Sequence, residues 1–301
     1  MRILLATDGS EDSRGATEWL RELPVPPTSS VLVLTVASGP MSARAERNDL
    51  LEVVRTDAWD VVQAARRSLA GRWAEIEERV VDGDPRSAIL QVRDDWGADL
   101  VVVGSRGLGA FAGMILGSVS IEVARHAPCA VLVTKGSPRP VRTAVVAIDG
   151  SANALAAARW LAALPLDRGV RVHLVAVAER PRYPSSAPGV IRPQLNAAIE
   201  EMVRERTQEL EKALGSVAGE FASVPATVER TAAVGNPADA IVAAAETARA
   251  DLVVVGARGL GTFERVLLGS VSERVLHNAS CPVLVVRSGP GAGDLKDTPG
   301  S

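Results

Sequence analysis

A pattern of glycines that would let the backbone approach a ligand closely occurs twice in the chain. Each copy lies where a phosphate group could bind. The pattern is G-x-x-G, nine further residues and then G-S, and its two copies are Gly104, Gly107, Gly117, Ser118 and Gly256, Gly259, Gly269, Ser270. Glycine has no Cβ and lets the backbone approach a ligand closely. A helix that begins after the last glycine would direct amides and a partial positive charge toward an anion. We therefore expect each copy to bind a phosphate group.

Each glycine pattern directly follows three consecutive valines, at 101–103 and 253–255. A short run of β-branched residues that ends at glycine predicts a buried parallel strand. Ligands of α/β proteins bind at the carboxyl ends of such strands. The glycines therefore lie where a ligand site is expected.

An internal repeat extends well beyond these glycines. Residues 99–133 align with 251–285 without a gap and are identical at 22 of 35 positions. The two copies in that alignment are 152 residues apart. Near the start of each half, the sequence Asp-Gly-Ser occurs at 8–10 and at 149–151, which are only 141 residues apart. The difference predicts an inserted, proline-rich loop within 178–200. We expect two homologous domains of ordinary size at 1–137 and 142–288, a linker at 138–141 and a disordered tail at 289–301.

Strand and helix patterns alternate through each half. The order βαβαβαβαβ predicts an α/β fold with two tandem, doubly wound, Rossmann-like parallel sheets of five strands. After the inserted loop, we expect the next helix to begin at Ile199. The fifth strands, 131–133 and 283–285, should lie at the edges of their sheets. The unpaired backbone groups of an edge strand must be covered by another segment to prevent indiscriminate pairing. They could pair with each other, and antiparallel pairing would keep Cys129 away from Cys281.

Composition narrows the classes of function. The net charge is −3 and no block of like charge is present, so neither a nucleic acid nor a membrane is an expected partner. No apolar run approaches the roughly 18 residues that a membrane helix needs. We expect a cytoplasmic location, with both cysteines as small core residues.

Residues that could catalyse a reaction are few. His126, His173 and His277 are the only histidines, and their positions favour structural roles over a general base. Ser10 and Ser151 are typical of helix N-caps rather than nucleophiles. No P-loop, dinucleotide fingerprint or zinc spacing is present. We expect no catalytic set and no protein-bound metal.

The aspartate after the first strand, together with the long glycine pattern, resembles the ATP-binding subclass of the universal stress proteins. Both features occur twice, as in a tandem-domain member, and the likeness covers residues 1–288. The resemblance implies a parallel sheet of strand order 3-2-1-4-5 in each half. It also implies two ATP sites per chain, with Mg²⁺ accompanying the nucleotide.

The resemblance implies binding roles for ten residues in each half. Asp8 and Asp149 would face the adenosine end or an associated metal, unless they serve only as turn residues. Arg106 and Arg258 would contact phosphate or ribose, or else be solvated surface residues. The two sets are Ala6, Asp8, Val36, Gly104, Arg106, Gly107, Gly117, Ser118, Val119, Ser120 and Ala147, Asp149, Val177, Gly256, Arg258, Gly259, Gly269, Ser270, Val271, Ser272.

The function that this resemblance favours is a nucleotide-dependent sensor in a stress response. Nucleotide binding would order the glycine loops and the 178–200 loop and so change the surface of the protein. A regulatory protein partner, or a second chain in a homodimer of tandem-domain chains, would bind that surface. The alternatives are a slow ATP hydrolase of the same fold and a protein-interaction module that binds no nucleotide. We expect unequal affinities, because Ala112-Gly113 in the first loop corresponds to Glu264-Arg265 in the second.

Overall fold

A computed structural model describes residues 1–38, 47–108, 116–181, 191–260 and 268–288, in which strands and helices alternate. The first half contains β1 (Arg2–Ala6), α1 (Glu11–Glu22), β2 (Ser30–Ala37), α2 (Arg47–Leu69), β3 (Ile76–Asp82), α3 (Pro85–Trp96), β4 (Leu100–Gly104), α4 (Ser118–His126) and β5 (Ala130–Thr134). The second half contains β6 (Thr143–Ile148), α5 (Ala152–Ala162), β7 (Arg171–Ala178), α6 (Arg192–Ala218), a 3₁₀ turn (Gly219–Phe221), β8 (Thr227–Val234), α7 (Pro237–Ala248), β9 (Leu252–Gly256), α8 (Ser270–Asn278) and β10 (Val283–Val286).

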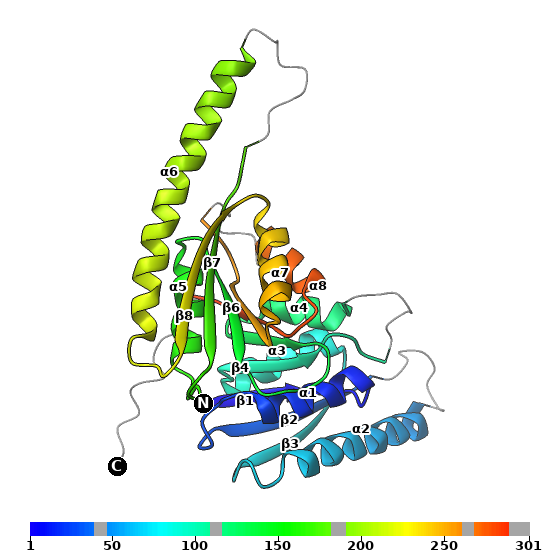
Figure 1. The fold of residues 1–301 in the computed structure, drawn as a ribbon. Helices are drawn as coiled ribbons and strands as arrows, with labels where there is room; N and C mark the ends of the chain where they lie inside the picture. The colour runs from blue at the N-terminus through cyan, green and yellow to red at the C-terminus, as the bar shows by residue number, and fades with distance from the viewer. Residues whose placement is uncertain (39–46, 109–115, 182–190, 261–267, 289–301) are drawn as a thin grey trace.

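The strands form one continuous sheet rather than two separate ones (Figure 1). The order is β3-β2-β1-β4-β5-β10-β9-β6-β7-β8, which confirms the order 3-2-1-4-5 in each half. Within each half the paired strands are parallel. The halves meet at an antiparallel pair, β5 and β10, in which Val133 faces Val283. The predicted pairing of the fifth strands is therefore confirmed, and it leaves Cys129 and Cys281 as free thiols.

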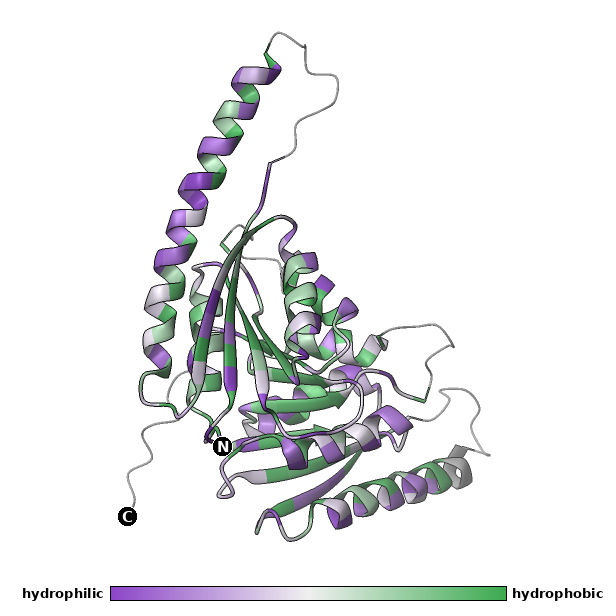
Figure 2. Cartoon of the chain, in the orientation of Figure 1, coloured by the Kyte–Doolittle hydropathy of each residue, from purple (hydrophilic) through white to green (hydrophobic). Residues whose placement is uncertain are grey.

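Both faces of the sheet are covered, because alternate residues of each strand enter different cores. Ile3 and Leu5 of β1 pack in a core with α1, α2, α5 and α6. Leu4 and Ala6 pack in the opposite core with α3, α4, α7 and α8. Burial on both faces explains why the central strands are hydrophobic along their whole length, as Figure 2 shows.

The helix after the inserted segment begins earlier than expected. α6 starts at Arg192 rather than Ile199, and Pro193 lies in its first turn. Proline is compatible with that turn, because the first helical N–H groups have no partner within the helix. The prediction that residues up to 198 belong to the loop is therefore wrong. The helix extends beyond the end of the sheet (Figure 1), while residues 182–190 of the predicted loop lie outside the described part of the chain.

Reciprocal contacts between basic side chains and helix ends also join the two halves. Arg287 follows β10 and donates hydrogen bonds to three carbonyl oxygens at the end of α4. Lys135, at the equivalent position after β5, donates to three carbonyl oxygens at the end of α8, at 2.5–3.2 Å. The last carbonyls of a helix lack partners within it and carry a partial negative charge. Each half therefore caps a helix of the other.

We predict that Arg287→Met and Lys135→Met each lower the free energy of unfolding by about 1–3 kcal/mol, because the helix-end carbonyls lose a charged donor. Urea unfolding followed by circular dichroism measures the change. Arg55→Met is the control, since its ion pair with Asp82 is exposed and should contribute little. An unchanged free energy of unfolding in both Arg287→Met and Lys135→Met would contradict a role for these contacts in joining the halves.

Candidate functional site

A cavity of about 610 Å³ opens at the carboxyl edge of the first half of the sheet. It lies where β1, β2 and β4 end, beside the start of α4 and one face of α2. Every residue of the first implied set lines it: Ala6, Asp8, Val36, Gly104, Arg106, Gly107, Gly117, Ser118, Val119 and Ser120. The structure thus brings together residues from three strand ends and one helix start.

The glycines are needed by the fold as well as by any ligand. A Cβ on Gly104 would lie 2.8 Å from the carbonyl group of Asp12, in the first turn of α1. A Cβ on Gly107 would lie 2.5 Å from Oδ2 of Asp8. Real Cβ atoms do not approach other atoms so closely, so any larger residue would push the loop away from β1 and α1. The same approaches recur at Gly256 and Gly259.

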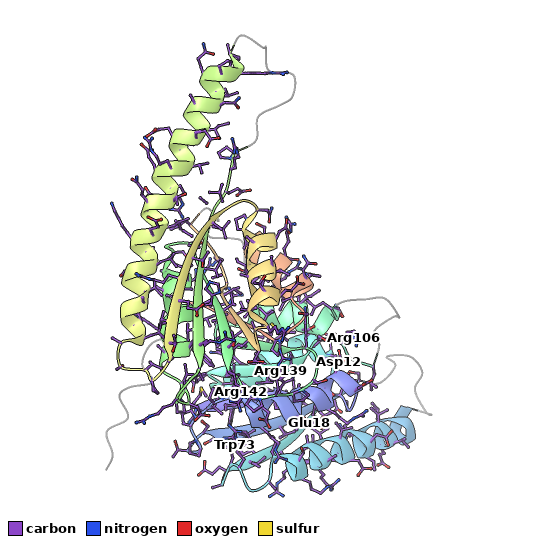
Figure 3. All side chains as sticks on the ribbon, in the orientation of Figure 1. Asp12, Glu18, Trp73, Arg106, Arg139 and Arg142 are labelled. Carbon is purple, nitrogen blue, oxygen red and sulfur yellow. The ribbon has the colours of Figure 1, made fainter. Side chains whose placement is uncertain are left out.

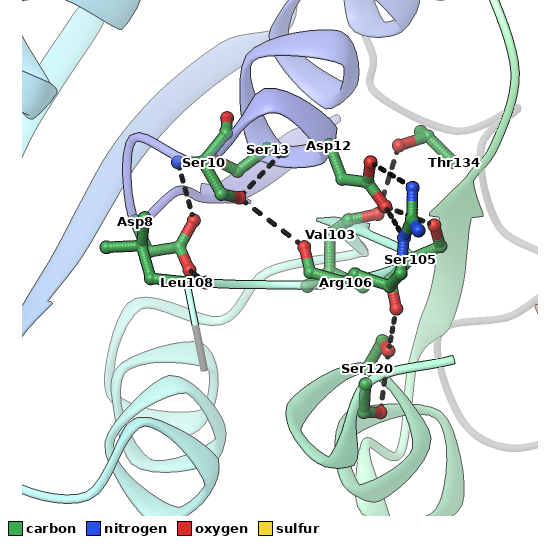
Figure 4. Close-up of polar contacts among 11 residues, drawn as sticks. Asp8, Ser10, Asp12, Ser13, Val103, Ser105, Arg106, Leu108, Ser120 and Thr134 are labelled. Atoms are coloured by element: carbon green, nitrogen blue, oxygen red, sulfur yellow. Dashed lines mark hydrogen bonds and ion pairs between the residues drawn. The ribbon is translucent and has the colours of Figure 1, made fainter. Parts of the chain in front are cut away.

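Asp8 ties the turn after β1 to the glycine loop (Figure 4). Its Oδ1 accepts a hydrogen bond from the Ser10 N–H at 3.0 Å, and its Oδ2 accepts one from the Leu108 N–H at 2.9 Å. Burial raises the pKa of Asp8, but hydrogen bonds from Ser10 and Leu108 outweigh it and lower that pKa below its ordinary value. Asp8 therefore acts as a turn residue while it also lines the cavity.

Arg106 is held at the rim of the cavity by a carboxylate of α1. Its Nε lies 2.9 Å from Oδ2 of Asp12 and its Nη2 lies 3.1 Å from Oδ1, and the Ser105 hydroxyl donates to the same Oδ2 at 2.6 Å. Figures 3 and 4 show the two side chains meeting beside the start of α1. The hydrogen bond from Arg106 lowers the pKa of Asp12. Arg106 is thus a paired residue rather than a freely solvated one.

The start of α4 presents backbone amides toward the cavity. Its N-cap is Gly117, which offers no side-chain cap, whereas α1 and α3 are capped by Ser10 and Asp84. The Gly117 N–H donates to the Ser105 carbonyl at 2.7 Å, and the buried Ser120 hydroxyl donates to the same oxygen at 2.9 Å. These two groups hold the loop. The exposed Ser118 and the first-turn amides, which have no partner within the helix, remain to face a ligand.

One wall of the cavity was not anticipated from the sequence. It comes from α2, which contributes Val54, Asp57, Ala58 and Val61. A spacing of three and four residues places these side chains on one helix face. That period was visible in the sequence, but which face turns toward the cavity depends on how α2 packs on β2 and β3.

The second half repeats the scaffold of the first. Asp149 Oδ1 accepts from the Ser151 N–H at 2.9 Å, and the Gly269 N–H donates to the Ala257 carbonyl at 2.7 Å. The Ser272 hydroxyl donates to the Gly256 carbonyl at 2.6 Å. Ala147 and Val177 lie in β6 and β7, and Ser270 and Val271 begin α8. The loop residues behind our prediction of unequal affinities, 112–113 and 264–265, lie outside the described residues.

Other candidate features are local. His126 contacts Glu122 at 3.0 Å and His277 contacts the Glu273 carbonyl at 2.9 Å. Within the described ranges, no three His, Cys, Asp or Glu side chains gather where they could hold a metal ion. Over the same ranges, no helix has the length and apolar character required to cross a membrane.

Comparison with known proteins identifies a family. A sequence model described as the universal stress protein family matches residues 1–135 and 140–287. A universal stress protein of Mycobacterium tuberculosis is 32% identical over 318 aligned residues, covering 95% of this chain and 94% of the relative. A second from that organism is 31% identical over 301 residues, covering 95% and 96%. The crystal structure of a universal stress protein from Archaeoglobus fulgidus has a similar fold, with 22% identity, a TM-score of 0.67 and coverage of 96% and 98%.

We predict that Asp8→Ala lowers the free energy of unfolding at pH 7 by about 1–3 kcal/mol, because two backbone N–H groups lose their acceptor. The pKa of Asp8 in the folded protein lies below the ordinary 3.8, so its contribution is present above pH 3.8 and is lost as the pH falls through the lower, folded value. Urea unfolding at pH 7 and in steps below pH 4 should show the difference from wild type shrinking. Asp57→Ala, which removes an exposed carboxylate of the same cavity, is the control. A difference that persists at the lowest pH would rule out the carboxylate as its source.

Proposed function

Because the chain belongs to the universal stress protein family, with a family match in each half, we propose that it binds one ATP in each half. The sites lie at the carboxyl edge of the sheet. We propose further that binding is the basis of a regulatory role in the stress response, without turnover of the nucleotide as a principal activity.

The observation that carries the proposal is that one cavity combines an apolar part with an anion-binding end. Ala6, Leu34, Val36 and Ile89 supply apolar lining near the ends of β1 and β2. A volume of about 610 Å³ is ordinary for a cofactor site. An adenine ring fits the apolar part by its chemistry, and main-chain groups at the end of β2 could bond its polar edge.

The phosphates would lie at the other end, where β4 gives way to the start of α4. Gly104 and Gly107 keep the loop close to β1 and α1, and this leaves the first turn of α4 open to a ligand. Amides at a helix start bind phosphate through hydrogen bonds and the helix dipole. The exposed Ser118 hydroxyl would add a further donor.

The charged groups favour binding over catalysis. Among the described lining residues, Asp8, Asp57 and Arg106 carry charge. Asp8 accepts two backbone hydrogen bonds and Arg106 is paired with Asp12, so neither is poised to activate a water molecule. A nucleotide that touches β1, β4 and α4 together would favour one arrangement of the glycine loop. That arrangement is the proposed signal.

We also propose four features that rest on the resemblance to the family and on composition rather than on the geometry of the site. They are Mg²⁺ bound with the nucleotide, a cytoplasmic location, a homodimer of tandem-domain chains and a regulatory protein partner.

Titration calorimetry with Mg-ATP tests the proposal. We expect two ATP per wild-type chain, one in Gly107→Val or Gly259→Val, and none in the double variant, because each added side chain collides with Asp8 or Asp149 and displaces the loop. Gly15→Ala is the control: it lies in α1 with open space around it and should bind as wild type does.

If circular dichroism shows that a valine variant is unfolded, Ser118→Asp and Ser270→Asp are used in place of Gly107→Val and Gly259→Val. Each aspartate adds a negative charge where phosphate would lie and should therefore weaken binding. A folded wild-type protein that binds neither ATP, ADP nor AMP would overturn the proposal.

A further inference from the structure

A second cavity, of about 340 Å³, lies between α1 and α2 in the first half. Small-molecule sites usually have volumes of about 300–1,000 Å³, so this space is large enough for a small ligand. Residues three or four positions apart share one face of a helix, and one such face of each helix lines the cavity. The lining includes Arg14, Thr17 and Glu18 of α1 and Asp60, Ala64 and Ser68 of α2.

The corresponding helices of the second half carry larger side chains. The end of α2 aligns with the end of α6 at the offset of 152, and the core residues there match in burial. Val62, Ala65 and Leu69 correspond to Leu214, Val217 and Phe221, and all of them are buried. Each residue of the second trio is larger than its counterpart. The first half therefore packs less side-chain volume beneath the same pair of helices.

An ion pair also ties these elements together in the second half. Arg159 of α5 and Glu220, in the 3₁₀ turn that follows α6, meet at 3.0 Å. The equivalent residues of the first half are Glu18 and Ser68. These two cannot form an ion pair, and both line the cavity instead. The space between α1 and α2 is therefore set by these side chains rather than by the fold that the two halves share.

Two carboxylates of the cavity are open to a ligand. Glu18 and Asp60 are exposed, and within the described ranges neither side chain takes part in a hydrogen bond or an ion pair. Figure 3 shows Glu18 in the space between α1 and α2. The third charged residue of the lining, Arg14, donates a hydrogen bond to the Gly9 carbonyl. The lining thus carries more negative than positive charge, and its guanidinium is already engaged by the protein.

The inner part of the cavity offers mainly apolar contact. Thr7 and Thr17 are buried there, and their hydroxyls bond within the protein: Thr7 to the Ser13 hydroxyl at 3.1 Å and Thr17 to the Ser13 carbonyl at 3.2 Å. Val61 and Ala65 of α2 complete this part. Because the hydroxyl protons are already donated, a hydrocarbon group is the best partner for these side chains.

We propose that this cavity binds a small organic cation, an amine whose apolar body contacts the inner part and whose ammonium group pairs with Glu18 and Asp60. Burial of the hydrocarbon stabilises the complex, and each carboxylate attracts the ammonium charge. The site is distinct from the proposed nucleotide site and does not depend on it. Thr7 and Val61 line both cavities, so the two sites are neighbours on opposite sides of one wall.

Three probes of similar size test the chemistry: phenethylamine, phenethyl alcohol and phenylacetate, which are cationic, neutral and anionic at neutral pH. Two-dimensional NMR of the full, isotope-labelled chain follows each titration with no nucleotide added. The amine should produce saturable shifts of the Thr17 and Ala64 amides. It should bind about three- to tenfold more tightly than the alcohol, the size expected for an ion pair near the surface, and phenylacetate should bind most weakly.

Substitutions then locate the site. Glu18→Gln and Asp60→Asn should each weaken binding of the amine by about two- to fivefold and leave binding of the alcohol within twofold of wild type. Glu11→Gln is the matched control, because it removes an exposed carboxylate of α1 that does not line the cavity. Ala64→Leu places a larger side chain in the cavity and should abolish binding of all three probes. If Ala64→Leu does not fold, the two carboxylate variants, which change exposed positions, still decide the outcome.

The results separate this proposal from the proposed nucleotide function. Preferential binding of the amine that weakens in Glu18→Gln and Asp60→Asn supports the inference. Failure of all three probes to bind, tighter binding of phenylacetate, or amine binding that is unchanged in both carboxylate variants or in folded Ala64→Leu overturns it. Each of these results leaves the nucleotide proposal standing, since that proposal is tested with Mg-ATP and the glycine variants.

Discussion

The approach of the β4 end to the first turn of α1 is the contact on which the site depends. It is possible because residue 104 has no side chain, and a Cβ there would collide with the backbone of Asp12. The contact brings Asp12 within reach of Arg106, and the next glycine lets Asp8 bond the Leu108 N–H. With the loop held on both sides, the start of α4 opens onto the cavity. The second half makes the same approach at Gly256.

The antiparallel pairing of β5 and β10 places both sites on one sheet. It removes two exposed edges, and Lys135 and Arg287 then satisfy the helix ends that this arrangement brings together. The helices capped in this way are α4 and α8, whose opposite ends begin the proposed phosphate sites. Each site is therefore built on a helix that the other half holds in place.

Local patterns in the sequence predicted most of the architecture, because valine runs, glycines and the repeat carry that information within short windows. The residues around the first cavity were instead implied by the resemblance to the family, and their binding roles stay predictions. The start of α6 was mistaken because Pro193 suits a loop and a helix start equally well. The pair of Arg106 with Asp12 joins residues 94 positions apart, and no local pattern reveals it. The α2 wall and the caps of Lys135 and Arg287 depend likewise on packing between distant elements.

The most direct test of the central claim is to denature the purified protein, with no nucleotide added, and to identify and count by mass spectrometry what it releases. The account predicts adenine nucleotide, with as many as two molecules per chain. Replacing Gly107 by valine should remove the nucleotide bound in the first half, and replacing Gly259 by valine should remove the one bound in the second half. Protein that releases no nucleotide, and takes up none when dialysed against Mg-ATP, would contradict the account while leaving the fold intact.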